Sequence, residues 1–438
     1  MFSRQLAAEL ITDFHNQEIP EFIPRAFDFS APKNKIRCLI GIRRAGKTFC
    51  FFQLIDELLK NKIEKERIIF INFEDERLLP LDISSLSSIL NTYYEIYPSF
   101  KDIKVYVFFD EIQNVSGWER FVRRIHDNEN VQINLTGSSS RLMSKEIATS
   151  LRGRTMAYEI SPFNFNEYLR FKNISRDYHS SKGKAYIIHA FNSYINKGGF
   201  PEVLGCSETF RLKILQDYFN LILYKDLIER YKIRNHSLLK YLLKFLFSNN
   251  ANPFSVNKFY RDSKSQGYVS SKDSLHNYLS YLEDAFCFSF VPIFSDSIRK
   301  QQVNYKKIYA VDHGLVTGMV SSSSYNTGRL LETMVHNQLR RHYSKEEIFY
   351  YRTSQKKEID FLVYKLGNIH TLIQVAETIT KPETRKRETA SLYQALKELN
   401  IKDAKIITGY EEELIKEDSY TIQVLPFWKW ALLPDFVS

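Results

Sequence analysis

The stretch GIRRAGKTF, residues 41–49, places two glycines, a lysine and a threonine at a spacing that suits phosphate binding. It fits the pattern G-x-x-x-x-G-K-[ST], and it lies between the apolar run IRCLI and a helical pattern, as this motif requires. The glycines let backbone N–H groups curl round a phosphate, Lys47 reaches the terminal phosphates, and the Thr48 hydroxyl is a Mg²⁺ ligand. We therefore expect nucleotide contacts from Gly41, Ala45, Gly46, Lys47, Thr48 and Phe49.

A second stretch, VYVFFDE, follows about sixty residues later and ends in two acids. Asp110 at the end of a strand can orient the shell of a Mg²⁺ ion, and Glu111 can polarise an attacking water. A D-E pair after a strand is usually a solvated turn, but beside a phosphate loop the functional interpretation is favoured. Glu111 is the part that hydrolysis needs and passive binding does not.

Two further segments offer residues for the same chemistry. The strand-like run VQINLTGSSS ends in small hydroxyl residues, of which Ser138 is the first candidate for contact with a γ-phosphate or a water, followed by Thr136 and Ser139. The stretch LRGR offers Arg154, ahead of Arg152, as an arginine that neutralises transition-state charge, in its own chain or in a neighbour. A Gly-Ser turn and a solvated arginine pair are the simpler interpretations.

Short β-rich runs near residues 36–40, 67–76, 104–113 and 131–140 alternate with helical patterns, which predicts an α/β fold with a parallel sheet covered on both faces. We place a P-loop domain at 1–170 and a helical lid at 171–235. A helix, turn, helix and strand from residue 253 onward predict a winged helix-turn-helix, at 236–300. Mixed strands and helices then form a last domain at 301–438.

The composition limits the class of protein. The chain has 438 residues, 44% of them hydrophobic, which is ample for several cores. No run approaches the roughly 20 apolar residues that span a bilayer, and the amino-terminal stretch lacks the apolar core of a secretion signal. The four cysteines are far apart in mostly apolar settings, as reduced thiols would be. We expect a cytoplasmic protein that makes no membrane contact.

The net charge of +10 is concentrated in the middle of the chain. Residues 171–300 hold 19 basic and 11 acidic side chains, a surplus of 8, whereas residues 1–170 are balanced at 23 against 23. A basic region is what a polyanion partner needs, so DNA is a candidate partner. A solvated surface that keeps a large protein soluble is the alternative.

Taken in order, many motifs of the chain resemble one widespread prokaryotic family. They are GIRRAGKT, FINFEDERL, FFDEIQNVSGWERFVRRI, LTGSSSRLMSKEIATSLRGR, SPFNFNEYL, GGFPEVL, YKDLIERY, GRLLETMVHNQLRR, EIDFLV and IQVAETIT. The family comprises AAA-like P-loop ATPases of the additional-strand, catalytic-glutamate division, with a restriction-endonuclease-like carboxyl-terminal domain. The resemblance implies a five-stranded core of order 5-1-4-3-2, a lid, a winged helix and hydrolysis of ATP with Mg²⁺. Asp110 and Glu111 match its Walker B pair.

The restriction-endonuclease-like domain looks inactive from its sequence. A metal-dependent nuclease of this type needs an acid on a helix, an aspartate on a strand and E-x-K on the next strand. Glu332 and Asp360 match the first two, and Glu358 shares a strand face with Asp360. Where E-x-K should stand, the chain has Gln374 and Ala376. With two carboxylates and no lysine, we expect weak metal binding and no efficient nuclease.

The leading functional hypothesis is an ATPase that couples hydrolysis to movement on a macromolecular partner, with DNA favoured by the basic middle region. A slow nucleotide-gated switch that acts on a protein partner, or on its own homo-oligomer, is the first alternative. An ATP-regulated nuclease is the weaker one. The catalytic set under the leading hypothesis is Glu111, Lys47, Arg154 and Ser138, with Thr48 and Asp110 on the metal.

Overall fold

The computed structural model describes residues 4–27, 29, 32, 34–79, 82–137, 151, 153–303, 305–320 and 326–433. The chain divides into two compact units, of which the first comprises Met1–Ser161 with Asp284–Phe286 and the second Pro162–Glu283 with Cys287–Ser438. None of the helices formed by these described residues is long and apolar enough to cross a membrane.

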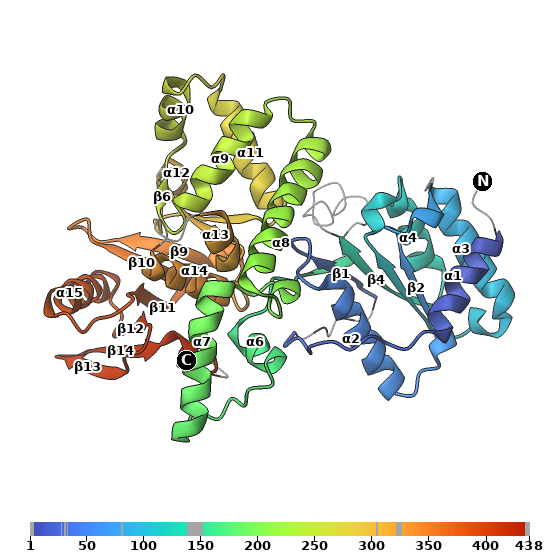
Figure 1. The fold of residues 1–438 in the computed structure, drawn as a ribbon, viewed down its shortest axis with the longest axis horizontal. Coiled ribbons are helices and arrows are strands. Elements are labelled where there is room, and N and C mark those ends of the chain that lie inside the picture. The colour runs from blue at the N-terminus through green and yellow to red at the C-terminus, as the bar shows by residue number, and fades with distance from the viewer. Residues whose placement is uncertain are drawn as a thin grey trace. The chain divides into compact units, whose positions relative to one another are not determined.

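The first unit is a sheet with helices on both faces (Figure 1). Its elements in chain order are α1 (Arg4–Asn16), β1 (Ile36–Ile40), α2 (Lys47–Lys60), β2 (Ile68–Asn72), α3 (Ile83–Ile96), β3 (Val105–Asp110), α4 (Trp118–Asn128), β4 (Val131–Gly137) and β5 (Thr155–Glu159). All the strand pairs are parallel, and the strands lie in the order β2-β3-β4-β1-β5. The predicted order 5-1-4-3-2 is therefore confirmed.

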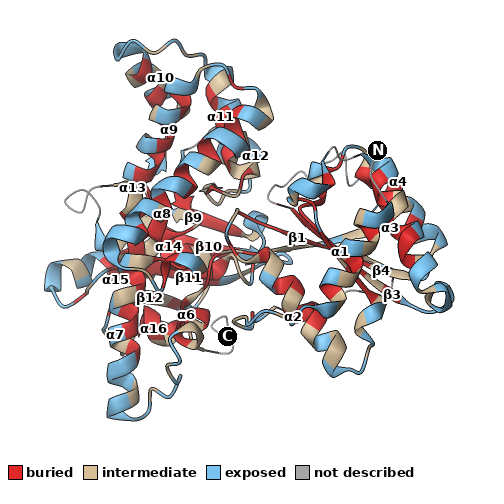
Figure 2. Cartoon of the chain, turned by 45° about the vertical axis from the view of Figure 1, so that its right-hand side comes forward, coloured by how far each residue is buried: buried red, intermediate tan, exposed pale blue. Residues whose placement is uncertain are grey.

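Side chains that alternate along each strand build two separate cores in the first unit. On one face, Cys38, Val107 and Leu135 pack with residues of α1, α3 and α4. On the other face α2 covers the sheet, and the rings of Phe51 and Phe108 lie 5.1 Å apart. Figure 2 shows the strands buried between helices whose outer sides are exposed. This sandwich fixes the carboxyl ends of the strands, where the loops that carry polar residues begin.

The second unit begins with helices and continues with two sheets. Its elements are α6 (Phe165–Phe171), α7 (Ser181–Lys197), α8 (Glu208–Leu221), a π-helical turn (Ile222–Glu229), α9 (His236–Ser248), β6 (Pro253–Phe254), α10 (Val256–Ser265), α11 (Lys272–Asp284), β7 (Phe288–Val291), α12 (Ile298–Val303), β8 (Lys306–Ala310), α13 (His313–Met319), α14 (Thr327–Leu339), β9 (Ile348–Arg352), β10 (Glu358–Lys365), β11 (Asn368–Val375), α15 (Pro382–Leu399), β12 (Asp403–Thr408), β13 (Glu413–Glu417), β14 (Tyr420–Pro426) and α16 (Phe427–Trp430).

Strand β8 belongs to a small antiparallel sheet of order β6-β8-β7, while β9 to β14 form a mixed sheet of order β13-β14-β12-β11-β10-β9. In the larger sheet β10 pairs antiparallel with β11, and Phe361 lies opposite Ile373. The next pair in that register is Asp360 with Gln374, so these two side chains share a face of the sheet. This register places Asp360 of EIDFLV beside Gln374 of IQVAETIT.

A buried aspartate joins two glycine motifs of the second unit. The carboxylate of Asp312 accepts hydrogen bonds from the backbone N–H groups of Gly199 and Gly314, each at 2.8 Å. A Cβ atom on Gly198 would lie 2.2 Å from Asp312 Oδ1, so the chain approaches too closely for any other residue. The stretches GGFPEVL and VDHGL are thereby held side by side.

Candidate nucleotide-binding site

The phosphate loop, residues 41–46, lies between the end of β1 and the start of α2. Because β1, β3 and β4 are parallel neighbours, their carboxyl ends meet at one edge of the sheet. Asp110 is the last residue of β3, and Thr136 is the penultimate residue of β4. The topology therefore brings three separate sequence motifs to the amino end of α2, where the helix dipole favours an anion.

Glycine is required at both ends of the loop. Gly41 has φ 141° and Gly46 has φ 92°, which are left-handed or extended-positive conformations that side chains disfavour. A Cβ on Gly41 would lie 2.1 Å from the carbonyl oxygen of Ile160. Ile160 N–H in turn donates to the Ile40 carbonyl at 2.7 Å. The loop is thus pinned to the segment after β5 and leaves no room for a side chain at its first position.

The carboxylate of Asp110 is the meeting point of the three motifs. Its Oδ2 accepts a hydrogen bond from the Thr48 hydroxyl at 2.7 Å, and its Oδ1 accepts one from the Thr136 hydroxyl. Thr136 also accepts from the Glu111 backbone N–H at 2.9 Å. Burial raises the pKa of Asp110 to about 6, although these hydrogen bonds and the charge of Lys47 oppose the shift. A cation beside this carboxylate would favour its charged form and so oppose the shift in pKa.

Lys47 and Glu111 lie beside each other and both are buried. The Lys47 ammonium donates to the carbonyls of Gly41 at 3.2 Å and Ile42 at 3.1 Å, and it lies 3.6 Å from Glu111 Oε1. Glu111 has φ 52°, a left-handed conformation that is uncommon outside glycine. The backbone therefore turns sharply after β3 and aims the carboxylate back toward the loop.

These residues fit a nucleotide with Mg²⁺. The loop has the two positive-φ glycines of a phosphate cradle, and its lysine already lies over the loop carbonyls. The carboxylate and hydroxyl oxygens of Asp110 and Thr48 are the donor types that Mg²⁺ takes. Ala45 is fully buried in the loop, whereas Phe49 is 49% exposed and its ring lies 5.8 Å from that of Phe52.

Arg154 is not at this edge of the sheet, so a role for it at its own phosphate loop is wrong. Its guanidinium pairs with Asp127 at 2.9 and 3.0 Å, and its carbonyl accepts a hydrogen bond from the N–H of Ile36. Ile36 is the first residue of β1, and the phosphate loop follows the last, roughly 13 Å further along the strand. Arg154 directly precedes β5, which is parallel to β1, and it therefore lies at the edge where the strands begin. A role in a neighbouring chain stays a prediction. Ser138, Ser139 and Arg152 lie outside the described residues.

Arg25 is a site residue that the motif search missed. It is 5% exposed, and its guanidinium donates to the carbonyl of Ala45 in the phosphate loop at 3.1 Å and to that of Ser161. Its backbone N–H donates to Gln53 Oε1 on α2 at 2.8 Å. A buried arginine between the loop and the segment after β5 fixes both. The only signal in the sequence is a lone basic residue in the segment IPEFIPRAF.

A second cluster of charges lies in the other unit, around Lys307 of β8. The Lys307 ammonium lies 2.6 Å from Glu332 Oε1, 2.9 Å from Asp360 Oδ1 and 3.3 Å from Glu358 Oε1. The side chain is 2% exposed. The prediction that these carboxylates have no lysine is therefore wrong. The lysine comes from a strand about fifty residues before Asp360, which no local spacing rule would detect.

The three carboxylates of this cluster keep the Lys307 ammonium charged. Burial lowers the pKa of Lys307, but the three acids outweigh it and hold that pKa well above its ordinary value. Burial raises the pKa of Glu332 to about 7, with the charge of Asp360 adding to the shift and Lys307 opposing it. Within the described ranges no three His, Cys, Asp or Glu side chains are placed to hold a metal ion. An ammonium takes the central position instead.

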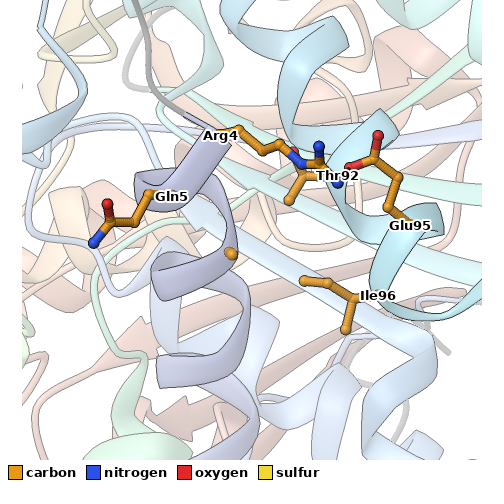
Figure 3. A pocket seen from close by; sticks show the side chains of 6 residues that line it. Arg4, Gln5, Thr92, Glu95 and Ile96 are labelled. Carbon is orange, nitrogen blue, oxygen red and sulfur yellow. Dashed lines mark ion pairs between the residues drawn. The ribbon is translucent and has the colours of Figure 1, made fainter.

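A hollow of about 390 Å³ between α1 and α3 has no comparable chemistry. It is lined by residues that include Ala8, Thr92 and Ile96, and its rim holds an ion pair of 2.6 Å between Arg4 and Glu95 (Figure 3). Both partners of that pair are largely exposed, so the pair contributes little to stability. The phosphate loop lies elsewhere in this unit, at the end of β1.

A parallel sheet of this order, with a glycine loop between β1 and α2 and acids at the end of β3, defines a P-loop nucleotide-binding domain of the AAA class. Residues 33–169 match the AAA domain family, and residues 188–326 and 327–430 match two domains of unknown function, DUF8612 and DUF4143.

The chain is similar along almost its whole length to an uncharacterized protein of Methanocaldococcus jannaschii, with 38% identity over 98% of this chain and 95% of the relative. An uncharacterized protein of Haemophilus influenzae is 30% identical over 91% of this chain and 94% of its own length. The chain belongs to the family that these two proteins represent.

Among solved structures, the Orc1 protein of Aeropyrum pernix, in complex with DNA, matches 73% of this chain and 91% of its own length, at 12% identity and a TM-score of 0.29.

Replacing Arg25 with methionine should weaken binding of ATP–Mg²⁺ by about tenfold, because the loop carbonyl of Ala45 loses a charged donor while the apolar stem is kept. Titration with a fluorescent ATP analogue measures the change. Arg67→Met is a matched control, since Arg67 is half-buried and donates to the carbonyl of Lys104, just before the far end of β3. Equal affinities for Arg25→Met and the unaltered chain would contradict the role.

Replacing Lys307 with methionine should destabilise the second unit by about 3–5 kcal/mol, because buried carboxylates lose their cation. Without the ammonium the buried acids can take up protons at pH 5.5, because burial already raises the pKa of Glu332 to about 7 and Lys307 no longer opposes the shift. At pH 8 they would be buried as unpaired charges. The stability lost on substitution should therefore be larger at pH 8 than at pH 5.5.

Urea unfolding followed by the fluorescence of Trp428 and Trp430, both in the same unit, measures this change when Trp118 of the first unit is replaced by phenylalanine in every variant. Lys306→Met is the control, since Lys306 precedes Lys307 on β8 and is exposed. A stability loss that matches the control, or one that is independent of pH, would show that the ammonium does not hold the cluster together.

Proposed function

We propose that the protein is a Mg²⁺-dependent ATPase. The observation that carries the proposal is the convergence of Lys47, Thr48, Asp110 and Glu111 at one edge of the sheet, where Thr48 donates to Asp110 at 2.7 Å and Lys47 lies 3.6 Å from Glu111. This arrangement has a phosphate cradle, a cation ligand and a base, and the base is superfluous to a protein that only binds nucleotide.

Each residue has one role in this proposal. Lys47 and the loop N–H groups hold the phosphates, and Thr48 and Asp110 hold the metal ion, which when bound neutralises charge on the phosphates. Glu111 accepts a proton from the attacking water, because it is a carboxylate aimed at the loop from the end of β3. Thr136 orients Asp110 and the Glu111 backbone together, since its hydroxyl contacts both.

We also propose that residues 171–235 form a lid, residues 236–300 a winged helix-turn-helix and residues 301–438 a restriction-endonuclease-like domain. What supports the last assignment is the clustering of Glu332, Glu358 and Asp360 around Lys307. Nuclease activity is not part of this proposal, because the ammonium lies where the carboxylates would otherwise share a metal ion.

DNA is the partner that the surface of α10 and α11 favours. Lys258, Arg261 and Lys264 of α10 and Lys272 of α11 are exposed, and the Tyr260 ring lies 4.9 Å from Lys264 Nζ and 5.9 Å from Lys272 Nζ. The exposed side of α11 then continues with the neutral polar residues His276, Asn277 and Ser280. Basic side chains can contact phosphates while such polar residues reach base edges.

Helix α11 also carries acids, Asp273, Glu283 and Asp284, which oppose contact with phosphates. Glu283 near the end of the helix lies 3.6 Å from Lys345, so its charge is partly balanced within the same unit. Asp273 is left as the main exposed acid among the basic residues at the start of the helix. The local balance is therefore positive where α10 and α11 meet.

Replacing Glu111 with glutamine should lower ATP turnover at least a hundredfold while affinity for ATP–Mg²⁺ changes little, because the amide keeps the shape but cannot accept the proton. Phosphate release and nucleotide titration measure the two quantities. Glu76→Gln, an exposed acid in the turn after β2, is the control. Turnover by Glu111→Gln that equals the unaltered rate would refute the ATPase mechanism.

Replacing Lys264 and Lys272 together with alanine should weaken binding of a short DNA duplex several-fold and reduce the slope of log affinity against log salt by about 2, since each lysine neutralises one phosphate. Fluorescence anisotropy at three salt concentrations measures both. The double variant Lys386→Ala, Lys402→Ala removes equal charge from exposed positions on other elements of the same unit. If both double variants bind alike, α10 and α11 are not the DNA surface.

A further inference from the structure

The turn that follows β3 brings a glutamine back beside the proposed catalytic acid. Glu111 precedes a single 3₁₀ turn, Ile112–Asn114, and its left-handed backbone folds that turn over the end of the strand. Ile112 is fully buried, and Asn114 Nδ2 donates to the carbonyl of Phe73 at 3.2 Å. Both ends of the turn are thereby anchored, which fixes the position of Gln113 between them.

The carboxylate of Glu111 has partners on both of its oxygens. Lys47 Nζ lies 3.6 Å from Oε1, and Gln113 Nε2 donates a hydrogen bond to Oε2. The amide oxygen of Gln113 is buried as well, and it accepts no hydrogen bond from any described residue. A buried acceptor without a donor is uncommon and costs free energy unless a ligand or water fills the place.

The two partners of Glu111 differ in what a nucleotide would do to them. Lys47 belongs to the phosphate loop, and its ammonium is needed by the phosphates when they are bound. Gln113 lies outside the loop and is neutral, so its hydrogen bond to Glu111 does not compete with the phosphates. A neutral donor also holds a carboxylate in place without neutralising the negative charge that a base requires.

We propose that Gln113 is a positioning residue for hydrolysis: its amide N–H holds Glu111 in the orientation that accepts the proton, and its amide oxygen accepts a hydrogen bond from the attacking water. The inference rests on the proposed ATPase function and adds a residue that neither the loop motif nor the D-E pair contains. One side chain then fixes both the base and the water relative to each other.

A packing role for Gln113 makes a different prediction. If the side chain only fills space, methionine, which has similar length and volume, should replace it with little effect. If it acts through Glu111, the substitution should reduce turnover while leaving nucleotide affinity intact, and the reduction should vanish when Glu111 is already disabled.

The experiment compares Gln113→Met with the unaltered full-length chain, and Gln113→Met, Glu111→Gln with Glu111→Gln alone, in single-turnover assays with radiolabelled ATP and Mg²⁺. We expect Gln113→Met to lower the hydrolysis rate about 10- to 100-fold, which is the effect of losing a hydrogen bond to a charged group. Affinity for the nucleotide should stay within twofold. In the Glu111→Gln background the second substitution should change the rate by less than twofold.

Gln132→Met is the matched control, because it makes the same substitution at the other edge of the sheet, where Gln132 Nε2 donates to the carbonyl of Lys35 at 2.9 Å, and it should leave hydrolysis within threefold. A rate for Gln113→Met within twofold of the unaltered chain overturns the inference. So does an equal fold-loss in both backgrounds, or a tenfold loss of nucleotide affinity, which would place Gln113 in loop structure. If the unaltered chain shows no Glu111-dependent hydrolysis, the proposed function fails and this inference fails with it. If the unaltered chain hydrolyses ATP and Gln113→Met does so at the same rate, only the inference is overturned.

Discussion

The carboxylate of Asp110 is the contact on which the organisation of the first unit's site depends. This carboxylate, at the end of β3, accepts hydrogen bonds from the hydroxyls of Thr48, at the start of α2, and Thr136, in β4. Burial opposes its charge and raises its pKa to about 6. Two hydroxyl donors compensate only part of that desolvation, so the site gains most when a cation completes the shell. The same group that joins the three motifs is therefore the group that favours Mg²⁺.

Much of this site follows from local sequence rules. The glycine loop was predictable because only glycine tolerates φ values such as 141° at Gly41, and the strand pattern before it and the helix after it restrict where the loop can lie. The meeting of Lys47 with Asp110 and Glu111 was predictable because parallel strands end at one edge of a sheet. The strand order was predicted as well, although from the resemblance to a family and not from the periodicity of the strand-like segments.

The residues that could not be predicted are those that reach a site from a distant segment. Arg25 contacts the phosphate loop from twenty residues upstream, in a segment without regular periodicity. Lys307 reaches Asp360 from another sheet, so a search for lysine two positions after a strand acid could only report its absence. The role of Arg154 at its own phosphate loop fails by the parallel-strand rule itself. Arg154 directly precedes β5, so it lies at the edge where the strands begin, and there it pairs with Asp127. A role in a neighbouring chain stays a prediction.

The two buried lysines show why one cluster is suited to bind a ligand and the other to hold the fold together. Lys47 donates to the neutral carbonyls of Gly41 and Ile42 and has one carboxylate, that of Glu111, at the longer distance of 3.6 Å. Hydrogen bonds to an anionic phosphate are stronger than bonds to carbonyls, so a nucleotide can take these bonds over. Lys307 instead has three carboxylates within 2.6 to 3.3 Å, and its side chain is 2% exposed. The first lysine is held by partners that it can exchange, and the second is held by partners that it cannot. This difference in acceptor charge separates the chemistry of the two units.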